Sequence, residues 1–179
     1  MHALEGFVRA VDRLNRVVGI AGAALIPAAV LLCAAVALLR YGFAFGRVWM
    51  QELYVVLAGV SFMILLARVH GLDGHVRVDI LWRRWSERRR ALVDLLGNLL
   101  FVLPWAFVLI WSSWGFVRLS WSVLEPSAQA GGLPGLFLVK SVIPLAALLL
   151  LLQGLAGAAR ALLRLTGRPD PLGLAGTTP

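Results

Sequence analysis

The sequence contains a run of 23 residues, 17–39, without a charged side chain. As a helix this run would rise about 35 Å, enough to cross the roughly 30 Å hydrocarbon core of a bilayer. Further apolar segments follow at 49–67, 92–114 and 136–155. With 60% hydrophobic and only 15% charged residues in a 179-residue chain, this apolar surface exceeds what a water-soluble core can bury. The sequence therefore predicts an all-α integral membrane protein with four membrane-spanning helices.

Lysine and arginine are distributed unevenly between the two sides that four spans define. The segment before the first span holds three, the central segment 68–90 holds seven and the tail from residue 160 holds three, so 13 of 17 share one side. Because basic residues concentrate on the cytoplasmic side of membrane proteins, we expect both termini and the central segment to be cytoplasmic. The basic blocks alternate with apolar runs, which favours membrane lipids over nucleic acid as partners.

The polar segments suggest how the chain is organised. Residues 1–16 combine apolar positions at helical spacing with a basic face, which predicts a short amphipathic helix in the membrane interface. A second interfacial helix is expected in the central segment at about residues 78–85. We therefore expect an amphipathic N-terminal segment, a four-helix membrane domain at 17–159 and a flexible cytoplasmic tail at 160–179.

The sequence offers little catalytic chemistry. Its densest polar group, at 70–79, holds two histidines and two aspartates, which could in principle ligate a metal. The spacing matches no metal-binding pattern, however, and the glycines predict a bent loop whose side chains bond its own backbone and arginines. None of the three histidines lies in a span, as a haem ligand would, and no glycine-rich phosphate loop is present. We therefore expect no metal, no cofactor and no enzymatic activity.

The charged residues closest to membrane depth lie at the ends of the spans. Glu52, Asp94 and Lys140 are placed where they reach water or headgroups rather than the bilayer centre. We expect Arg47 and Glu52 to form a structural pair at the start of the second span, and Gln153 to make a hydrogen bond between helices. A self-contained transporter would need a central charge and usually has repeated halves. Their absence from the sequence favours a subunit that works with a larger partner.

Several short motifs resemble those of a known family. They are Gly74-His75-Val76-Arg77-Val78-Asp79-Ile80, Gly131-Gly132-Leu133-Pro134, Lys140 with Ile143-Pro144-Leu145, Leu149-Leu150-Leu151-Leu152-Gln153, and Trp49 with Glu52. In this order and at these distances, the chain resembles the small, Q-type (DctQ-like) permease subunit of tripartite ATP-independent periplasmic (TRAP) transporters over roughly residues 40–160. It is most similar to the branch labelled mannitol/chloroaromatic compound transport. The family often has two acidic residues where this chain has Gln51 and Glu52.

The resemblance implies a function in the bacterial inner membrane. A periplasmic solute-binding protein would deliver an organic acid to a large, M-type permease subunit, which moves it in an elevator-like motion driven by a sodium gradient. The small subunit would brace the large one and help to dock the binding protein. A self-contained homodimeric transporter is the alternative. The candidate structural or partner-interface residues are Arg47, Trp49, Glu52, His75, Arg77, Asp79 and Lys140.

Overall fold

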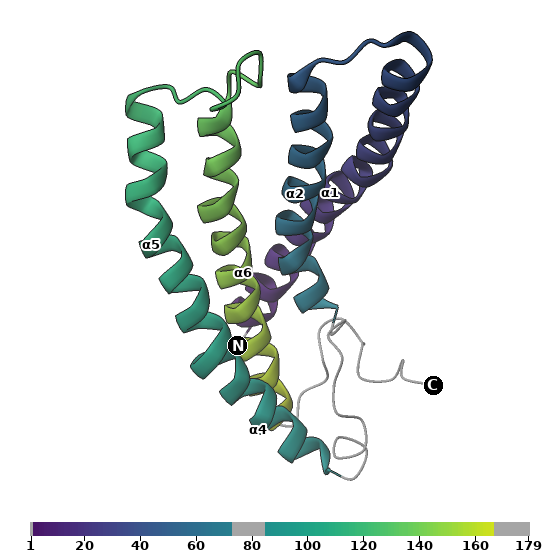
Figure 1. The fold of residues 1–179 in the computed structure, drawn as a ribbon. Coiled ribbons are helices and arrows are strands. Elements are labelled where there is room, and N and C mark those ends of the chain that lie inside the picture. The colour runs from purple at the N-terminus through teal and green to yellow at the C-terminus, as the bar shows by residue number, and fades with distance from the viewer. Residues whose placement is uncertain (1, 73–84, 167–179) are drawn as a thin grey trace.

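The computed structural model describes residues 2–72 and 85–166, and its regular structure is entirely helical within them (Figure 1). Four continuous helical segments are long and apolar enough to cross a membrane. The prediction of an all-α membrane protein with four spans is therefore confirmed. The elements are α1 (His2–Phe43), α2 (Val48–Gly71), a third span built from α4 (Glu87–Gly97), η1 (Asn98–Val102) and α5 (Leu103–Ser122), and α6 (Leu136–Leu165).

The four spans form two pairs, α1 with α2 and α5 with α6, and α6 contacts every other span. The connections 44–47 and 123–135 lie at the same end of the molecule, which we call the loop end (Figure 1). The start of α1 and the end of α6 lie toward the opposite end, which we call the terminal end. In Figure 1, α2 and α6 approach each other toward the terminal end and diverge toward the loop end.

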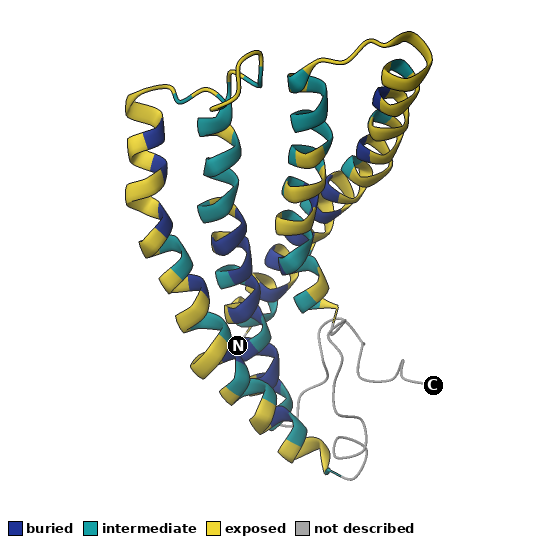
Figure 2. Ribbon diagram, in the orientation of Figure 1, coloured by how far each residue is buried: buried dark blue, intermediate teal, exposed yellow. Residues whose placement is uncertain are grey.

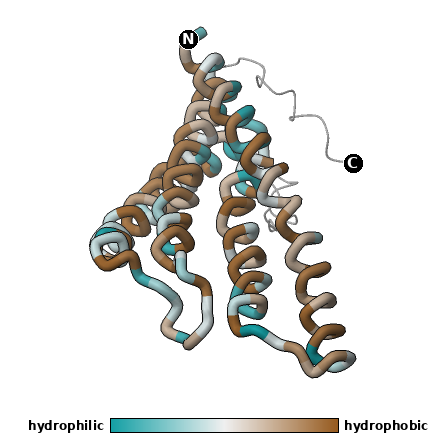
Figure 3. Tube along the Cα trace, turned by 90° about the horizontal axis from the view of Figure 1, so that it is seen from above, coloured by the Kyte–Doolittle hydropathy of each residue, from teal (hydrophilic) through white to brown (hydrophobic). Residues whose placement is uncertain are grey.

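Small residues allow the helices to pack closely around α6. A Cβ atom on Gly154 would lie 2.9 Å from the Val102 side chain, and one on Gly157 would lie 2.8 Å from that of Asn98. Such close backbone approach is typical of membrane helix interfaces. Figure 2 shows that buried residues concentrate in the half of α6 nearer the terminal end. The outer faces of the helices stay exposed, and hydrophobic residues run along most of their length (Figure 3).

The first helix is longer than the sequence predicts. It runs without a break from His2 to Phe43, so residues 1–16 do not form a separate short helix. Its 42 residues would rise about 63 Å, roughly twice the thickness of the hydrocarbon core. Val8 and Val11 are buried against Ala156 and Ala159 of α6, which anchors this first part of the helix to the bundle. Its position in the membrane interface stays a prediction.

The last helix also extends further than predicted. It continues to Leu165, so residues 160–165 are helical and are packed against the bundle rather than part of a flexible tail. The predicted interfacial helix at 78–85 and the remaining tail fall almost wholly outside the described residues. Within the third span, the wide π-turn at Asn98–Val102 ends just before Pro104, which has no N–H to donate to the preceding turn.

Candidate functional site

At the loop end, the start of α2 is tied to the connection between α5 and α6. The Glu52 carboxylate accepts a hydrogen bond from the backbone N–H of Leu133, at 2.7 Å, and another from the Ser127 hydroxyl. The Trp49 N–H donates to the carbonyl oxygen of Gly131, at 3.2 Å. One carboxylate in the first turns of α2 therefore fixes a loop that lies about 80 residues further along the chain.

Gly131 and Gly132 of this loop are required for different structural reasons. Gly131 has a φ of +76°, in the left-handed region where a side chain is strained. A Cβ on Gly132 would lie 2.7 Å from Glu52 Oε2 and 2.5 Å from the Ser127 oxygen. The motif that begins at Gly131 thus allows the backbone to approach the carboxylate closely.

Lys140 is fixed in the same region by an ion pair. Its Nζ lies 2.5 Å from a carboxylate oxygen of Glu125 and 4.0 Å from the centre of the Phe116 ring. The hydrogen bond from Lys140 is the main reason why the pKa of Glu125 lies below its ordinary value. Nearby, the Trp121 indole N–H donates to the Ser141 hydroxyl at 2.7 Å, which joins α5 to α6.

A cavity of about 400 Å³ lies between α2 and α6 near these contacts. Its lining is mainly apolar and includes Val55 and Val56 of α2 and Val139 of α6. Gln51 and Glu52 also line it. The cavity has room for an apolar group from a neighbouring molecule, but its few polar groups do not resemble a catalytic constellation.

Toward the terminal end, buried polar side chains connect α1 to α6. Gln153, which is only 1% exposed, accepts a hydrogen bond from the Asn15 amide at 2.5 Å. Its own amide donates to Asp12 at 2.9 Å, and Arg160 lies 3.6 Å from the same carboxylate. Gly71, at the end of α2, packs so closely that a Cβ there would lie 2.4 Å from the Gln153 nitrogen. The predicted interhelical hydrogen bond of Gln153 is confirmed.

A second polar cluster connects α2, α4, η1 and α6. His70 Nε2 and Asn98 Oδ1 share a hydrogen bond of 3.0 Å, and the Asn98 amide donates to the backbone carbonyl of Asp94. The Asp94 carboxylate is paired with Arg164 at 3.3 Å. These polar contacts hold the helices in register. They place no charge at the bilayer centre, because the groups lie near the ends of the apolar runs.

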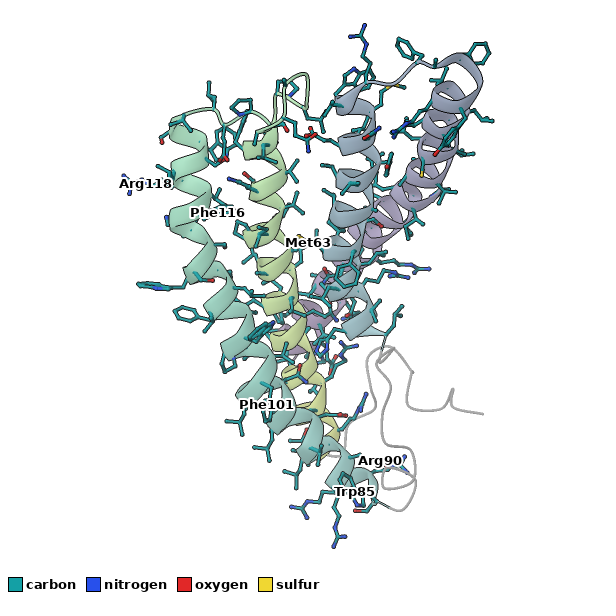
Figure 4. All side chains as sticks on the ribbon, in the orientation of Figure 1. Met63, Trp85, Arg90, Phe101, Phe116 and Arg118 are labelled. Carbon is teal, nitrogen blue, oxygen red and sulfur yellow. The ribbon has the colours of Figure 1, made fainter. Side chains whose placement is uncertain are left out.

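The outer face of the third span is apolar and rich in aromatic rings. Phe101, Trp105 and Phe107 are 73%, 60% and 59% exposed, and they lie near the middle of the apolar run. Phe107 stacks on Trp111, which is also exposed. Arg118 extends away from the bundle near the loop end (Figure 4). This face must contact either lipid or another protein.

The structure describes only some of the predicted site residues. Arg47 lies over the Phe45 ring at 5.6 Å, whereas Glu52 bonds the 123–135 loop, so the structure gives these two residues different partners from the predicted pair. Trp49 lies in the first turn of α2, just before Glu52, and is 42% exposed. His75, Arg77 and Asp79 lie outside the described residues. No group of three or more His, Cys, Asp or Glu suited to a metal occurs in the described part of the chain.

Sequence reasoning missed the partners of Gln153. Asp12 and Asn15 are spaced three residues apart on α1, and Arg160 lies two turns after Gln153 on α6, so each set shares one helix face. This spacing was the available signal, but Asp12 lies in the segment predicted to be a separate interfacial helix and Arg160 in the segment predicted to be a flexible tail. The partners of Glu52 had no comparable signal because they lie in an irregular loop.

Comparison with known proteins decides the family. The family described as Tripartite ATP-independent periplasmic transporters, DctQ component, matches residues 28–164. The chain belongs to the DctQ family. Searches of curated proteins and of solved structures each gave no match.

Membership makes this DctQ protein a small membrane component of a TRAP transporter, not an enzyme. Together with the four apolar helices, it identifies a multi-pass inner-membrane protein. The assignment to the mannitol/chloroaromatic branch stays a prediction. The matched range covers the loop-end contacts of Glu52 and includes Gln153, whereas Asp12 and Asn15, the partners of Gln153, lie before it.

Proposed function

We propose that this DctQ protein braces a large M-type permease subunit during sodium-driven, binding-protein-dependent uptake of an organic acid. The observation that carries the proposal is the distribution of charge. No Asp, Glu, Lys or Arg occurs between residues 16 and 40, 52 and 68, 94 and 118, or 140 and 160. A protein that coupled transport by itself would need an ionisable group at membrane depth. The brace needs only apolar outer faces and fixed helix positions.

The polar contacts supply the fixed positions. Glu52 ties α2 to the loop before α6 at one end, while Gln153 and Asp12 tie α6 to α1 toward the other. A frame held at two separated points resists tilting of its helices against one another. Such resistance is what a moving partner requires of the part that stays still.

We propose that the termini face the cytoplasm and that the loop end is periplasmic, because 13 of the 17 basic residues then lie inside. In this orientation the 123–135 loop faces the solute-binding protein. Its conformation is held by Glu52, Gly131 and Gly132, so it presents a fixed surface. Sodium coupling and an organic acid substrate are supported by the family resemblance alone.

The aromatic face of the third span is the proposed contact with the large subunit. Tryptophan in membrane helices concentrates at the two interfaces, whereas Trp105 lies in the middle of an apolar run. Aromatic side chains are enriched at the centres of protein interfaces. Phe101 and Trp105 are four residues apart, so they form one continuous exposed patch.

The test is copurification of the large subunit with the tagged chain. The double variant Phe101→Leu with Trp105→Leu keeps the span apolar but removes ring area, so we expect severalfold less large subunit to copurify. Phe62→Leu is the matched control because Phe62 is 73% exposed on α2, and it should copurify the large subunit as the wild type does. If the double variant copurifies as much large subunit as Phe62→Leu does, the aromatic face is not the contact with the large subunit. Transport by the purified chain alone in liposomes would favour the homodimeric alternative.

A further inference from the structure

A cavity of about 250 Å³ lies between α1, the end of α2 and α6, apart from the loop-end contacts, and most of the residues around it are of polar types. Arg16 and Arg68, which line it, directly flank the uncharged runs 17–39 and 53–67. It therefore lies where a span meets the headgroup layer. The residues that line it include Asp12, Asn15, Arg16, Arg68, Gly71 and Gln153.

Two of these lining residues differ from the other arginines near them. Arg160 and Arg164 each form an ion pair with an aspartate. Arg16 and Arg68 form no ion pair or side-chain hydrogen bond within the described part of the chain. Two guanidinium groups from neighbouring helices thus border one cavity, and neither forms an ion pair with an acidic residue that the structure describes.

Arg68 is held in place rather than extended into solvent. Its side chain lies across Gly19 of α1, where a Cβ would come within 2.1 Å of the Arg68 Cδ atom. Packing of this kind reduces the entropy that the side chain would lose on binding a ligand. Arg16 is exposed on the same helix, three residues before Gly19. The pair therefore combines one packed and one exposed donor, and guanidinium donors match phosphate oxygens in geometry.

The cavity wall also contains an acceptor without a donor. Asp12 Oδ2 is buried and accepts no hydrogen bond from the described residues, while Oδ1 is bonded to Gln153 and lies beside Arg160. Leaving such an oxygen unpaired costs free energy, and a donor that reached it would remove that cost. A ligand with a phosphate for the arginines has the matching chemistry, and a neighbouring hydroxyl would pair with Asp12 Oδ2 once a side chain that covers this oxygen moves aside.

We propose that this cavity binds the phosphate headgroup of an anionic phospholipid of the phosphatidylglycerol type. A lipid fits better than a soluble phosphate ester because the site borders exposed apolar side chains. Val17 and Ile20 of α1 are 61% and 59% exposed, and Val69 of α2 is 37% exposed, so acyl chains have a surface to follow. The bound headgroup would bridge α1 and α2 where no salt bridge of the described residues joins them.

The test uses native mass spectrometry of the full-length chain in detergent, titrated with phosphatidylglycerol, phosphatidylcholine or sn-glycerol 3-phosphate. The wild type should bind phosphatidylglycerol in preference to phosphatidylcholine. The double variant Arg16→Gln with Arg68→Gln should lose about 30-fold in phosphatidylglycerol affinity, the effect of two arginines near an anionic headgroup. Arg9→Gln with Arg13→Gln removes the same charge from the same helix end and should keep the preference.

Several outcomes would overturn the proposal. Equal loss in both double variants would mean diffuse attraction to negative charge, and no preference in the wild type would mean no headgroup site. Competition by sn-glycerol 3-phosphate at the lipid's own concentration would exclude the lipid assignment. If the double variant does not fold, the phosphatidylglycerol affinity of Arg16→Gln alone tests the proposal, because Arg16 is exposed and its replacement leaves the packing intact. An affinity equal to that of the wild type would then overturn it. The experiment needs no large subunit, so its result is independent of the bracing function.

Discussion

Replacing Gln153 by leucine would keep a side chain of similar size in the bundle but remove its polar contacts. The wild-type residue is 1% exposed and bonds both Asn15 and Asp12 across the α1–α6 contact. In Gln153→Leu the Asn15 amide loses its acceptor. Asp12 loses one donor but keeps Arg160 at 3.6 Å. The variant therefore isolates the contribution of the amide to holding α1 on α6.

The expected cost follows from two kinds of loss. Interhelical hydrogen bonds in membranes average about 0.6 kcal/mol each. Leaving a buried polar group unpaired adds about 1 kcal/mol or more. With two bonds lost and the Asn15 amide stranded, Gln153→Leu should lower the free energy of unfolding by about 2–3 kcal/mol. Gln51→Leu is the matched control, because Gln51 makes no side-chain hydrogen bond within the described residues, and it should change stability by less than about 0.5 kcal/mol.

Unfolding in mixed micelles with increasing SDS, followed by far-ultraviolet circular dichroism, measures both variants. A double-mutant cycle with Asn15→Leu sharpens the result, because residues in one hydrogen-bonded network should not be additive. The double variant should be more stable than the sum of the two single losses predicts. Wild-type stability in Gln153→Leu, or strict additivity in the cycle, would refute the claim that this network holds α1 to α6.

Three further predictions concern the loop end. Gly132→Ala should lower the free energy of unfolding by about 1–3 kcal/mol, since the new Cβ would lie 2.7 Å from Glu52 Oε2. The control Gly59→Ala, where a Cβ meets nothing within 4 Å, should be neutral or stabilising in the same SDS titration. If both variants lose the same free energy of unfolding, the close contact of Gly132 with Glu52 is contradicted. Glu52→Gln should speed hydrogen exchange of the 123–135 backbone, measured by mass spectrometry, because a neutral amide accepts hydrogen bonds from the loop more weakly than a carboxylate does. Unchanged protection would show that Glu52 does not hold the loop. Because the pKa of Glu125 is lowered in the folded protein, chiefly by Lys140, the pair stabilises the fold above the carboxyl's ordinary pKa, and this contribution is lost as the pH falls through the lowered value. The stability difference between wild type and Lys140→Met should therefore shrink in acid, and a difference independent of pH would contradict this.

The sequence was sufficient to predict features that depend on local composition. Long apolar runs, with charged residues only near their ends, identified all four spans, and an isolated amide in an apolar run indicated the interhelical bond of Gln153. Both signals are strong because hydrocarbon leaves a polar group no solvent partner. The lengths of α1 and α6 were underestimated because hydropathy ends where the bilayer core ends, whereas these helices continue to pack on each other through Val8 and Ala156.

Contacts between distant irregular segments were beyond sequence reasoning. Nothing in the pattern around Glu52 indicates that it bonds the backbone of Leu133, because a loop conformation depends on tertiary contacts rather than on periodicity. Asp12 and Arg160 belong to segments that were predicted to lie outside the four-helix domain, yet they meet beside Gln153 because both helices extend past their apolar runs. The Gly131-Gly132 pair was visible as a motif, but its reason became clear only with the carboxylate in place.

The bracing function is tested most directly by sodium-driven uptake in proteoliposomes that contain the large subunit and are supplied with the binding protein. Uptake is measured with and without this chain at equal amounts of folded large subunit. If the chain braces the large subunit, uptake requires it, although the chain has no charge at membrane depth to couple transport itself. Equal uptake without the chain would contradict the bracing function.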